Sequence, residues 1–167
     1  YETYEVWLPE LVQYVRERLP KTTKLMLHQT WAYAADAKHT GFNNYNRNQL
    51  TMYHSIVDAV KQAGKLVGIK MIIPSGTAIQ NARTSFVGDH MTRDGYHLDL
   101  KIGRYTAACT WFERIFKRSA VGNAYAPEGL DDAHRKVAQQ AAHEAVLHPY
   151  RITDLGGEKN PLYKDPN

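Results

Sequence analysis

Two short apolar segments, residues 24–30 and 69–73, are the stretches of this sequence that fit buried β-strands. Segments with helical periodicity precede, separate and follow them, and they predict helices over residues 7–19, 48–63, 105–116 and 130–147. An order of helix, strand, helix and strand is typical of a parallel sheet with right-handed crossovers. The fold class expected is therefore α/β.

Two parallel strands are too few for such a fold. They leave two exposed edges and cannot cover the apolar faces of four helices, whereas sheets usually contain about five or six strands. We therefore expect residues 1–155 to form the C-terminal part of a single domain, whose sheet is completed by a preceding segment outside this sequence. Residues 156–167 are expected to form a tail.

The connections between these elements carry turn signals. Residues 31–46 and most of 77–100 lack periodicity and are predicted to be loops, while Pro74, Ser75 and Gly76 predict a turn after the second strand. Gly64 is expected to end the second helix as a left-handed cap. Parallel sheets bind ligands beyond the carboxyl ends of their strands, which directs attention to the loops after residues 30 and 73.

Charge and composition exclude several classes of function. The 21 Lys and Arg residues exceed the 17 Asp and Glu residues by four, but they are scattered among acidic side chains, so we expect no nucleic-acid partner. No apolar run approaches the roughly 18 residues of a membrane span. The single cysteine, Cys109, excludes an internal disulfide and a cysteine-based zinc site, and its apolar neighbours predict a buried thiol.

An aspartate stands three residues before a histidine in three places: Asp36 and His39, Asp94 and His97, and Asp131 and His134. In a turn, this spacing lets the carboxylate accept the Nδ1 proton and leaves Nε2 as a general base. The first pair lies in a long loop and the third at a predicted helix start, where a capping aspartate is common. Gly95 and Leu98 favour Asp94 and His97, because Gly95 permits a tight turn and Leu98 can anchor it in the core.

Four motifs support a family resemblance: HQTWAY at 28–33, IIPSGTAIQ at 72–80, RDGYHL at 93–98 and GRY at 103–105. Across residues 1 to about 125, the sequence resembles the C-terminal half of the DUF4886 group of the SGNH (GDSL-like) hydrolase superfamily. The resemblance implies a flavodoxin-like three-layer α/β/α fold with a parallel sheet, in which His97 is the catalytic base and Asp94 its partner. The serine nucleophile and the glycine and asparagine of the oxyanion hole would lie upstream of Tyr1.

The implied activity is hydrolysis of an ester through an acyl-enzyme, with the O-acetyl ester of a carbohydrate as the favoured substrate. Residues at or just beyond the predicted strand ends are the expected substrate-binding set: Gln29, Trp31, Gln80 and Arg83. Members of this group often look exported, which suggests a periplasmic or secreted protein. The motifs call for neither a metal nor another cofactor.

Three alternatives stay open. Ser75 follows a strand and could be a nucleophile, although the G-x-S-x-G pattern is absent. Asp89, His90, Asp94 and His97 offer metal-ligating side chains within nine residues, in a spacing that matches no familiar metal motif. The chain could also belong to a binding scaffold without a working nucleophile. His28 is expected to be a satisfied core histidine, and His54, His143 and His148 to lie on helix faces or ends.

Overall fold

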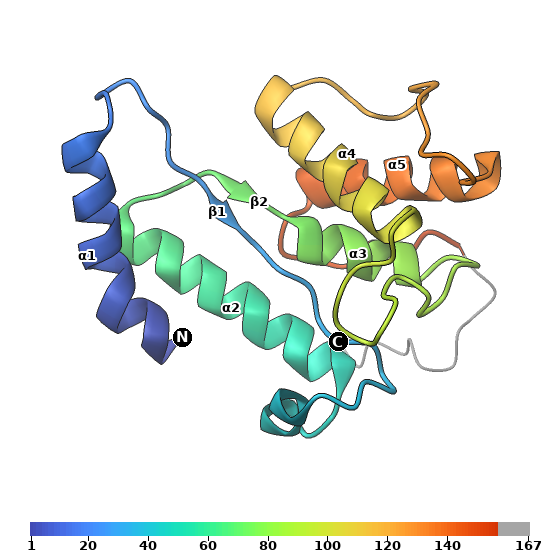
Figure 1. Cartoon of the computed structure of the whole chain (residues 1–167), viewed down its shortest axis with the longest axis horizontal. Coiled ribbons are helices and arrows are strands. Elements are labelled where there is room, and N and C mark those ends of the chain that lie inside the picture. Colours follow the sequence, from blue (N-terminus) through green and yellow to red (C-terminus); the bar gives the residue numbers. More distant parts are fainter. Residues whose placement is uncertain (157–167) are drawn as a thin grey trace.

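The computed structural model describes residues 1–156 and shows a mostly helical α/β arrangement around a small parallel sheet (Figure 1). Its elements, in chain order, are α1 (Glu2–Arg18), β1 (Leu27–His28), the 3-10 helix η1 (Thr40–Tyr45), α2 (Gln49–Val67), β2 (Ile72–Ile73), α3 (Ser75–Arg83), α4 (Ile102–Phe116) and α5 (Asp132–Leu147). The predicted tail lies outside the described residues, apart from Gly156.

The sheet confirms the predicted parallel pairing but not the predicted strand lengths. Leu27 pairs with Ile72 and His28 with Ile73, and the backbone N–H of Leu27 donates to the carbonyl of Met71 at 3.0 Å. Both residues of β1 are half-buried, whereas a strand buried on both faces was expected. The two described strands leave β1 without a neighbour on its second edge, and this explains the partial burial.

The two edges of the sheet differ. On β2, the outward carbonyl of Ile72 accepts a hydrogen bond from Nε of Arg114 in α4, at 2.8 Å. On β1, the alternation of a parallel ladder turns the backbone N–H and C=O of His28 away from β2. Within residues 1–156, β1 is therefore an edge strand with an open side.

Helix α2 runs alongside the strands and packs against α1, which lies at the periphery (Figure 1). Their contact buries Leu8 and Val12 of α1 against Ala63 and Val67 of α2. The side chain of Asn48 begins α2 by accepting from the N–H of Thr51 at 2.8 Å, as expected of an N-cap.

The predicted end of α2 is wrong by four residues. Gly68, with a φ of +66°, is the left-handed cap, and Gly64 lies inside the helix. A Cβ on Gly64 would stand 2.8 Å from the carbonyl oxygen of Ile69, so this glycine allows the chain to pass closely over the helix end. Glycine is needed at position 64 because the backbone of Ile69 packs against it, and not because the chain turns there.

Helix α3 replaces the turn and loop predicted after β2. All nine of its residues, from Ser75 to Arg83, are buried. A helix surrounded on every side does not alternate polar and apolar faces, and this one carries buried polar side chains as well. The sequence of α3 therefore lacks the 3.6-residue repeat of apolar residues that predicts a helix, and the segment was expected to be a turn and a loop.

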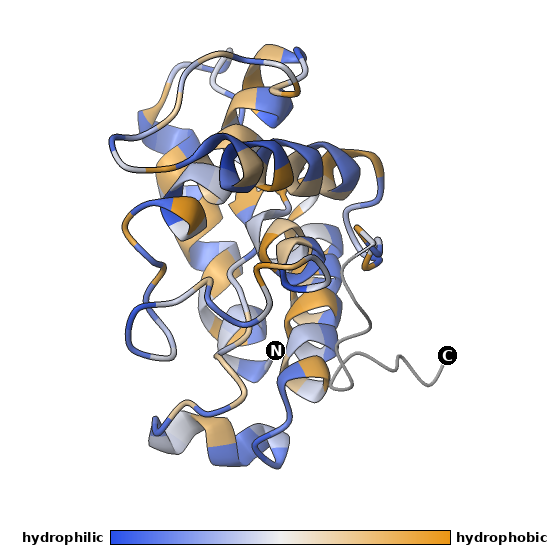
Figure 2. Ribbon diagram, turned by 90° about the vertical axis from the view of Figure 1, so that its right-hand side faces the viewer, coloured by the Kyte–Doolittle hydropathy of each residue, from blue (hydrophilic) through white to orange (hydrophobic). Residues whose placement is uncertain are grey.

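The largest core lies among α3, α4 and α5, where Ile79, Met91, Ile102 and Ala141 pack together. Cys109 is buried here as predicted, and burial raises the pKa of its thiol to about 11. Figure 2 shows hydrophobic and hydrophilic residues interspersed along the helices rather than a uniformly hydrophobic helix. No helix of residues 1–156 has the length and hydrophobicity needed to cross a membrane.

Candidate active site

Asp94 and His97 form a hydrogen-bonded pair in the loop between α3 and α4. Oδ2 of Asp94 lies 2.7 Å from Nδ1 of His97, and Oδ1 of Asp94 accepts from the backbone N–H of His97 at 2.8 Å. The carboxylate thus fixes both the ring and the turn that carries it. Because Nδ1 faces the carboxylate, Nε2 is the nitrogen that can take up a proton from a reactant. Both side chains reach solvent, with 39% and 55% of their surfaces exposed.

The electrostatics of the pair favour an ionised carboxylate. The hydrogen bond from the His97 side chain, followed by the one from its backbone, lowers the pKa of Asp94 to about 2. Asp94 is therefore an anion at any pH near neutrality. It can orient the imidazole and stabilise the imidazolium that forms when His97 accepts a proton.

Gly95 and Leu98 hold this loop as the sequence predicted. Gly95 has a φ of +91°, and a Cβ there would stand 2.9 Å from the Cβ of Ala37. Leu98 is buried in the core next to α4. Thr92 and Leu98 also form an isolated antiparallel bridge, which closes the loop at its base.

The loop is docked near the carboxyl end of β1. Nε1 of Trp31, three residues beyond the strand, donates to the carbonyl of Tyr96 at 2.8 Å, and the N–H of Ala34 donates to the carbonyl of Gly95 at 2.7 Å. His97 follows Tyr96 directly, and their rings lie 4.3 Å apart between centroids. The pair is thus fixed at the end of the sheet where parallel folds bind ligands.

The pair at the start of α5 has nearly the same local geometry. Oδ2 of Asp131 lies 2.7 Å from Nδ1 of His134, and Oδ1 accepts from the backbone N–H of His134 at 2.9 Å. Asp131 is the N-cap of α5, which confirms its predicted capping role. The Asp-x-x-His bond is therefore not unique to Asp94 and His97, and position in the fold is what distinguishes this pair.

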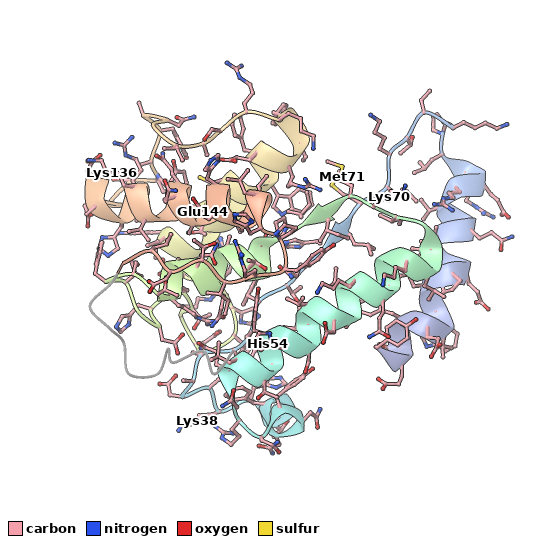
Figure 3. The ribbon with its side chains drawn as sticks, turned by 180° about the vertical axis from the view of Figure 1, so that it is seen from behind. Lys38, His54, Lys70, Met71, Lys136 and Glu144 are labelled. Atoms are coloured by element: carbon pink, nitrogen blue, oxygen red, sulfur yellow. The ribbon has the colours of Figure 1, made fainter. Side chains whose placement is uncertain are left out.

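The first pair has a different structure. Nδ1 of His39 accepts from the backbone N–H of Gly41 at 3.0 Å and begins η1. His28, expected in the core, is half-buried between Trp31 and Trp111, and burial lowers its pKa. His54 projects from α2 (Figure 3), while His143 lies in α5 and His148 at its end, as predicted.

Three of the four expected substrate-binding side chains are not on the surface. Gln29, Gln80 and Arg83 follow the strands in the chain as expected, but they are fully buried, so their side chains do not line a surface open to a substrate. Oε1 of Gln29 accepts from the N–H of Thr77 at 2.9 Å, and Nε of Arg83 lies 2.8 Å from Oδ1 of Asp89. These side chains join β1, α3 and the following loop from within.

Trp31, the fourth, lines a cavity of about 700 Å³ at the end of β1. The sequence reasoning missed the tyrosines beside it. Tyr33 and Tyr96 belong to two of the motifs quoted above, which was the available signal, whereas Tyr45 comes from η1 and had none. The lining residues are Tyr1, Glu2, Thr3, Tyr4, Thr30, Trp31, Tyr33, Asn44, Tyr45, Met52, Ser55, Ile56, Ala59, Val60 and Tyr96.

The alternative sites gain no support from the structure. Oγ of Ser75 is buried and has no hydrogen-bond partner within the described residues, so no base activates it there. The four possible metal ligands also diverge: within residues 1–156, no three His, Cys, Asp or Glu side chains are grouped so that they could hold a metal ion. Asp89 instead accepts from the N–H of Ala35 at 2.7 Å and pairs with Arg83.

Comparison with known proteins gave a family match and a structural match, and both concern the same family. Residues 1–145 match a family described as a domain of unknown function, DUF4886. The crystal structure of a DUF4886 family protein from Bacteroides uniformis ATCC 8492 is similar in fold, with a TM-score of 0.91 and 67% sequence identity. The match covers 93% of this chain and 60% of that chain. No significant similarity to a curated protein was found.

Proposed function

The chain belongs to the DUF4886 family, and we propose that the intact protein is an SGNH-type serine esterase in which His97 is the general base and Asp94 orients it. The observation that carries the proposal is the 2.7 Å bond from Asp94 to Nδ1 of His97, in a loop tied to the end of β1 through Trp31 and Tyr96. This leaves Nε2 for proton transfer where a ligand is expected.

The nucleophile in this proposal comes from residues outside the present sequence. The chain spans 60% of the length of the solved relative, so a protein of that length has a further segment. We place additional strands of that segment against the open edge of β1, which gives a flavodoxin-like sheet. Helices α1 and α2 would belong to one outer layer and α4 to the other. The serine would then lie at the carboxyl end of a strand of that segment, which would also supply the glycine and the asparagine of the oxyanion hole.

The proposed reaction is acyl transfer in two halves. Nε2 of His97 takes the serine proton while the hydroxyl attacks the ester carbonyl, and the imidazolium then protonates the departing alcohol. Water repeats the sequence on the acyl-enzyme, which releases the acid and restores the serine. Asp94 stays ionised throughout and stabilises the imidazolium. The favoured substrate is an O-acetyl ester of a carbohydrate, for which Trp31 offers an aromatic face.

The test is hydrolysis of an acetyl ester by the full-length protein. His97→Ala should lower kcat/KM by about 10³-fold or more, because general-base catalysis contributes about 10²–10⁴-fold. His134→Ala is the matched control, since it removes an imidazole with the same local aspartate bond from the start of α5. Activity that is absent from the wild type, or equal in the two variants, would contradict the proposal.

A binding scaffold is the second candidate. The observation that favours it is the pair Asp131–His134, which shows the same bond in the role of a helix cap. In that case the full-length protein would bind a glycan ester without hydrolysing it. Locating a serine beside Nε2 of His97 in the full-length protein would decide between the two.

A further inference from the structure

The cavity at the end of β1 is formed by four separate parts of the chain. They are the first turn of α1, the segment after β1, the start of α2 with η1, and Tyr96 of the loop that carries His97.

Aromatic side chains give this cavity its character. Trp31, Tyr33, Tyr45 and Tyr96 line it, and each is half-buried. Tyr33 and Tyr96 lie 5.9 Å apart between centroids, and the indole of Trp31 is fixed by its bond to the carbonyl of Tyr96. Rings held in this way lose little freedom when a ligand stacks on them.

The polar side chains of the lining are almost uncharged. Thr30, Asn44 and Ser55 supply hydroxyl and amide groups, and Glu2 is the one charged side chain of the lining. The absence of Lys and Arg from this lining disfavours a phosphate or carboxylate ligand, which would need a cation. Flat aromatic faces with neutral hydrogen-bonding groups suit a sugar ring, which has apolar C–H faces and a hydroxyl edge.

We propose that this cavity is the subsite that holds a neutral sugar ring of the substrate. The inference rests on the proposed esterase function, because the ring of Tyr96 lies 4.3 Å from that of His97 between centroids. A sugar stacked beside Tyr96 would bring its ester groups toward the general base. Tyr33, Tyr45 and Tyr96 would thus select a glycan ester over a small alkyl ester.

The experiment measures binding of deacetylated neutral oligosaccharides, xylotetraose and mannotetraose, to the full-length protein by calorimetry. A variant in which every tryptophan of the full-length protein except Trp31 is replaced by phenylalanine, Trp7 and Trp111 included, reports the same binding through the fluorescence of Trp31. We expect saturable binding of at least one probe. Tyr33→Ala and Tyr96→Ala should each weaken it about tenfold, because each removes a stacking ring.

Two controls separate stacking from folding. Tyr33→Phe keeps the ring and should bind within about twofold of the wild type, and its thermal unfolding should be unchanged. Tyr125→Ala removes an exposed tyrosine from the segment between α4 and α5 and should have no effect.

The binding measurement does not depend on a working nucleophile. Binding without hydrolysis would support the subsite and refute the esterase, whereas hydrolysis of a small ester without binding of either probe would refute the subsite alone. The subsite is also refuted if Tyr33→Ala and Tyr96→Ala bind like the wild type. A full-length structure in which protein side chains fill the cavity would refute it as well.

Discussion

At the scale of single residues, Arg83 is the largest of the fully buried side chains among residues 1–156. It is fully buried, with Nε 2.8 Å from Oδ1 of Asp89 and a hydrogen bond from its terminal nitrogen to Oε1 of Gln80 at 2.9 Å. It also donates to the carbonyl of Ala32 at 3.1 Å, which ties α3 to the segment after β1. A buried guanidinium of this kind orders the loops around the candidate site instead of meeting a ligand.

Loss of this guanidinium should be costly. Arg83→Met leaves Asp89 without its cation and several polar groups without a donor, so we expect the free energy of unfolding to fall by about 3–5 kcal/mol. Lys136→Met is the control, because Lys136 pairs with Asp132 on the surface of α5 and should change stability by less than about 1 kcal/mol. Urea denaturation of both variants measures the difference. Equal losses would contradict the structural role of Arg83.

The pair Asp94–His97 makes a prediction about pH that does not require activity. The pKa of Asp94 is depressed from 3.8 to about 2, chiefly by the His97 side chain. The stabilisation from a depressed carboxyl is complete above its ordinary pKa and is lost as the pH falls toward about 2. The ¹³C NMR shift of the Asp94 carboxyl should therefore titrate near pH 2 in the wild type. In His97→Ala the midpoint should rise toward 3.8, and His134→Ala should leave it unchanged.

At the scale of elements, the contact between α3 and the end of β1 depends on Gly76. The N–H of Gly76 donates to the carbonyl of Gln29 at 3.1 Å, and a Cβ at this position would stand 1.9 Å from the carbonyl oxygen of Thr30. Backbone therefore packs directly on backbone, with no room for a methyl group. This contact aligns the start of α3 with the strand end beside the candidate site.

We expect Gly76→Ala to lower the free energy of unfolding by about 3 kcal/mol or more, because the backbone segments must move apart. Gly122→Ala is the matched control. Gly122 has a φ of +82° and open space around its Cβ position, so the substitution costs about 1 kcal/mol of backbone strain and no clash. Thermal or urea unfolding distinguishes the two. A smaller loss at Gly76 than at Gly122 would refute the close approach.

The elements that the sequence predicted are those with two unlike faces. α2, α4 and α5 each bury one side, so their apolar residues repeat with the helical period. α3 is buried on all sides, and Thr77, Gln80 and Arg83 form hydrogen bonds inside the protein. Its apolar residues therefore do not repeat with the helical period, and the sequence does not predict this helix. The predicted strands were longer than the observed ones. An apolar run indicates which residues are buried, but it does not indicate how many of them form hydrogen bonds to a neighbouring strand.

The candidate site divides along the same lines. The bond between Asp94 and His97 spans three residues, so the spacing together with the turn residue Gly95 could predict it, whereas Asp36 and His39 share the spacing without the bond. The cavity near it combines Tyr33, Tyr45 and Tyr96 from parts of the chain up to 63 residues apart, which no local pattern could bring together. Full burial of Gln29, Gln80 and Arg83 likewise depends on how α3 packs, which was not predicted.

At the scale of the whole molecule, two surfaces lack a partner within the described residues. The second edge of β1 is open, and α1 exposes Trp7, Leu11 and Tyr14 on the flank next to the buried Leu8. A groove of about 650 Å³ runs along these exposed apolar side chains. Figure 1 shows α1 at the periphery, on the same side of the molecule as the strand edge. The chain spans 60% of the solved relative, and we propose that a further segment of the full-length protein covers both surfaces.

This arrangement predicts that α1 is a buried helix in the full-length protein. Leu11→Lys should then lower the free energy of unfolding by about 2 kcal/mol or more, because it puts an unpaired ammonium against apolar neighbours. Leu147→Lys on α5 is the matched control: Leu147 is 56% exposed and Leu11 57% in the structure, yet the control should cost less than about 0.5 kcal/mol. Urea denaturation of the two full-length variants gives the comparison. Small, equal losses would mean that the apolar face of α1 stays open to solvent, and that the sheet is completed without covering this helix.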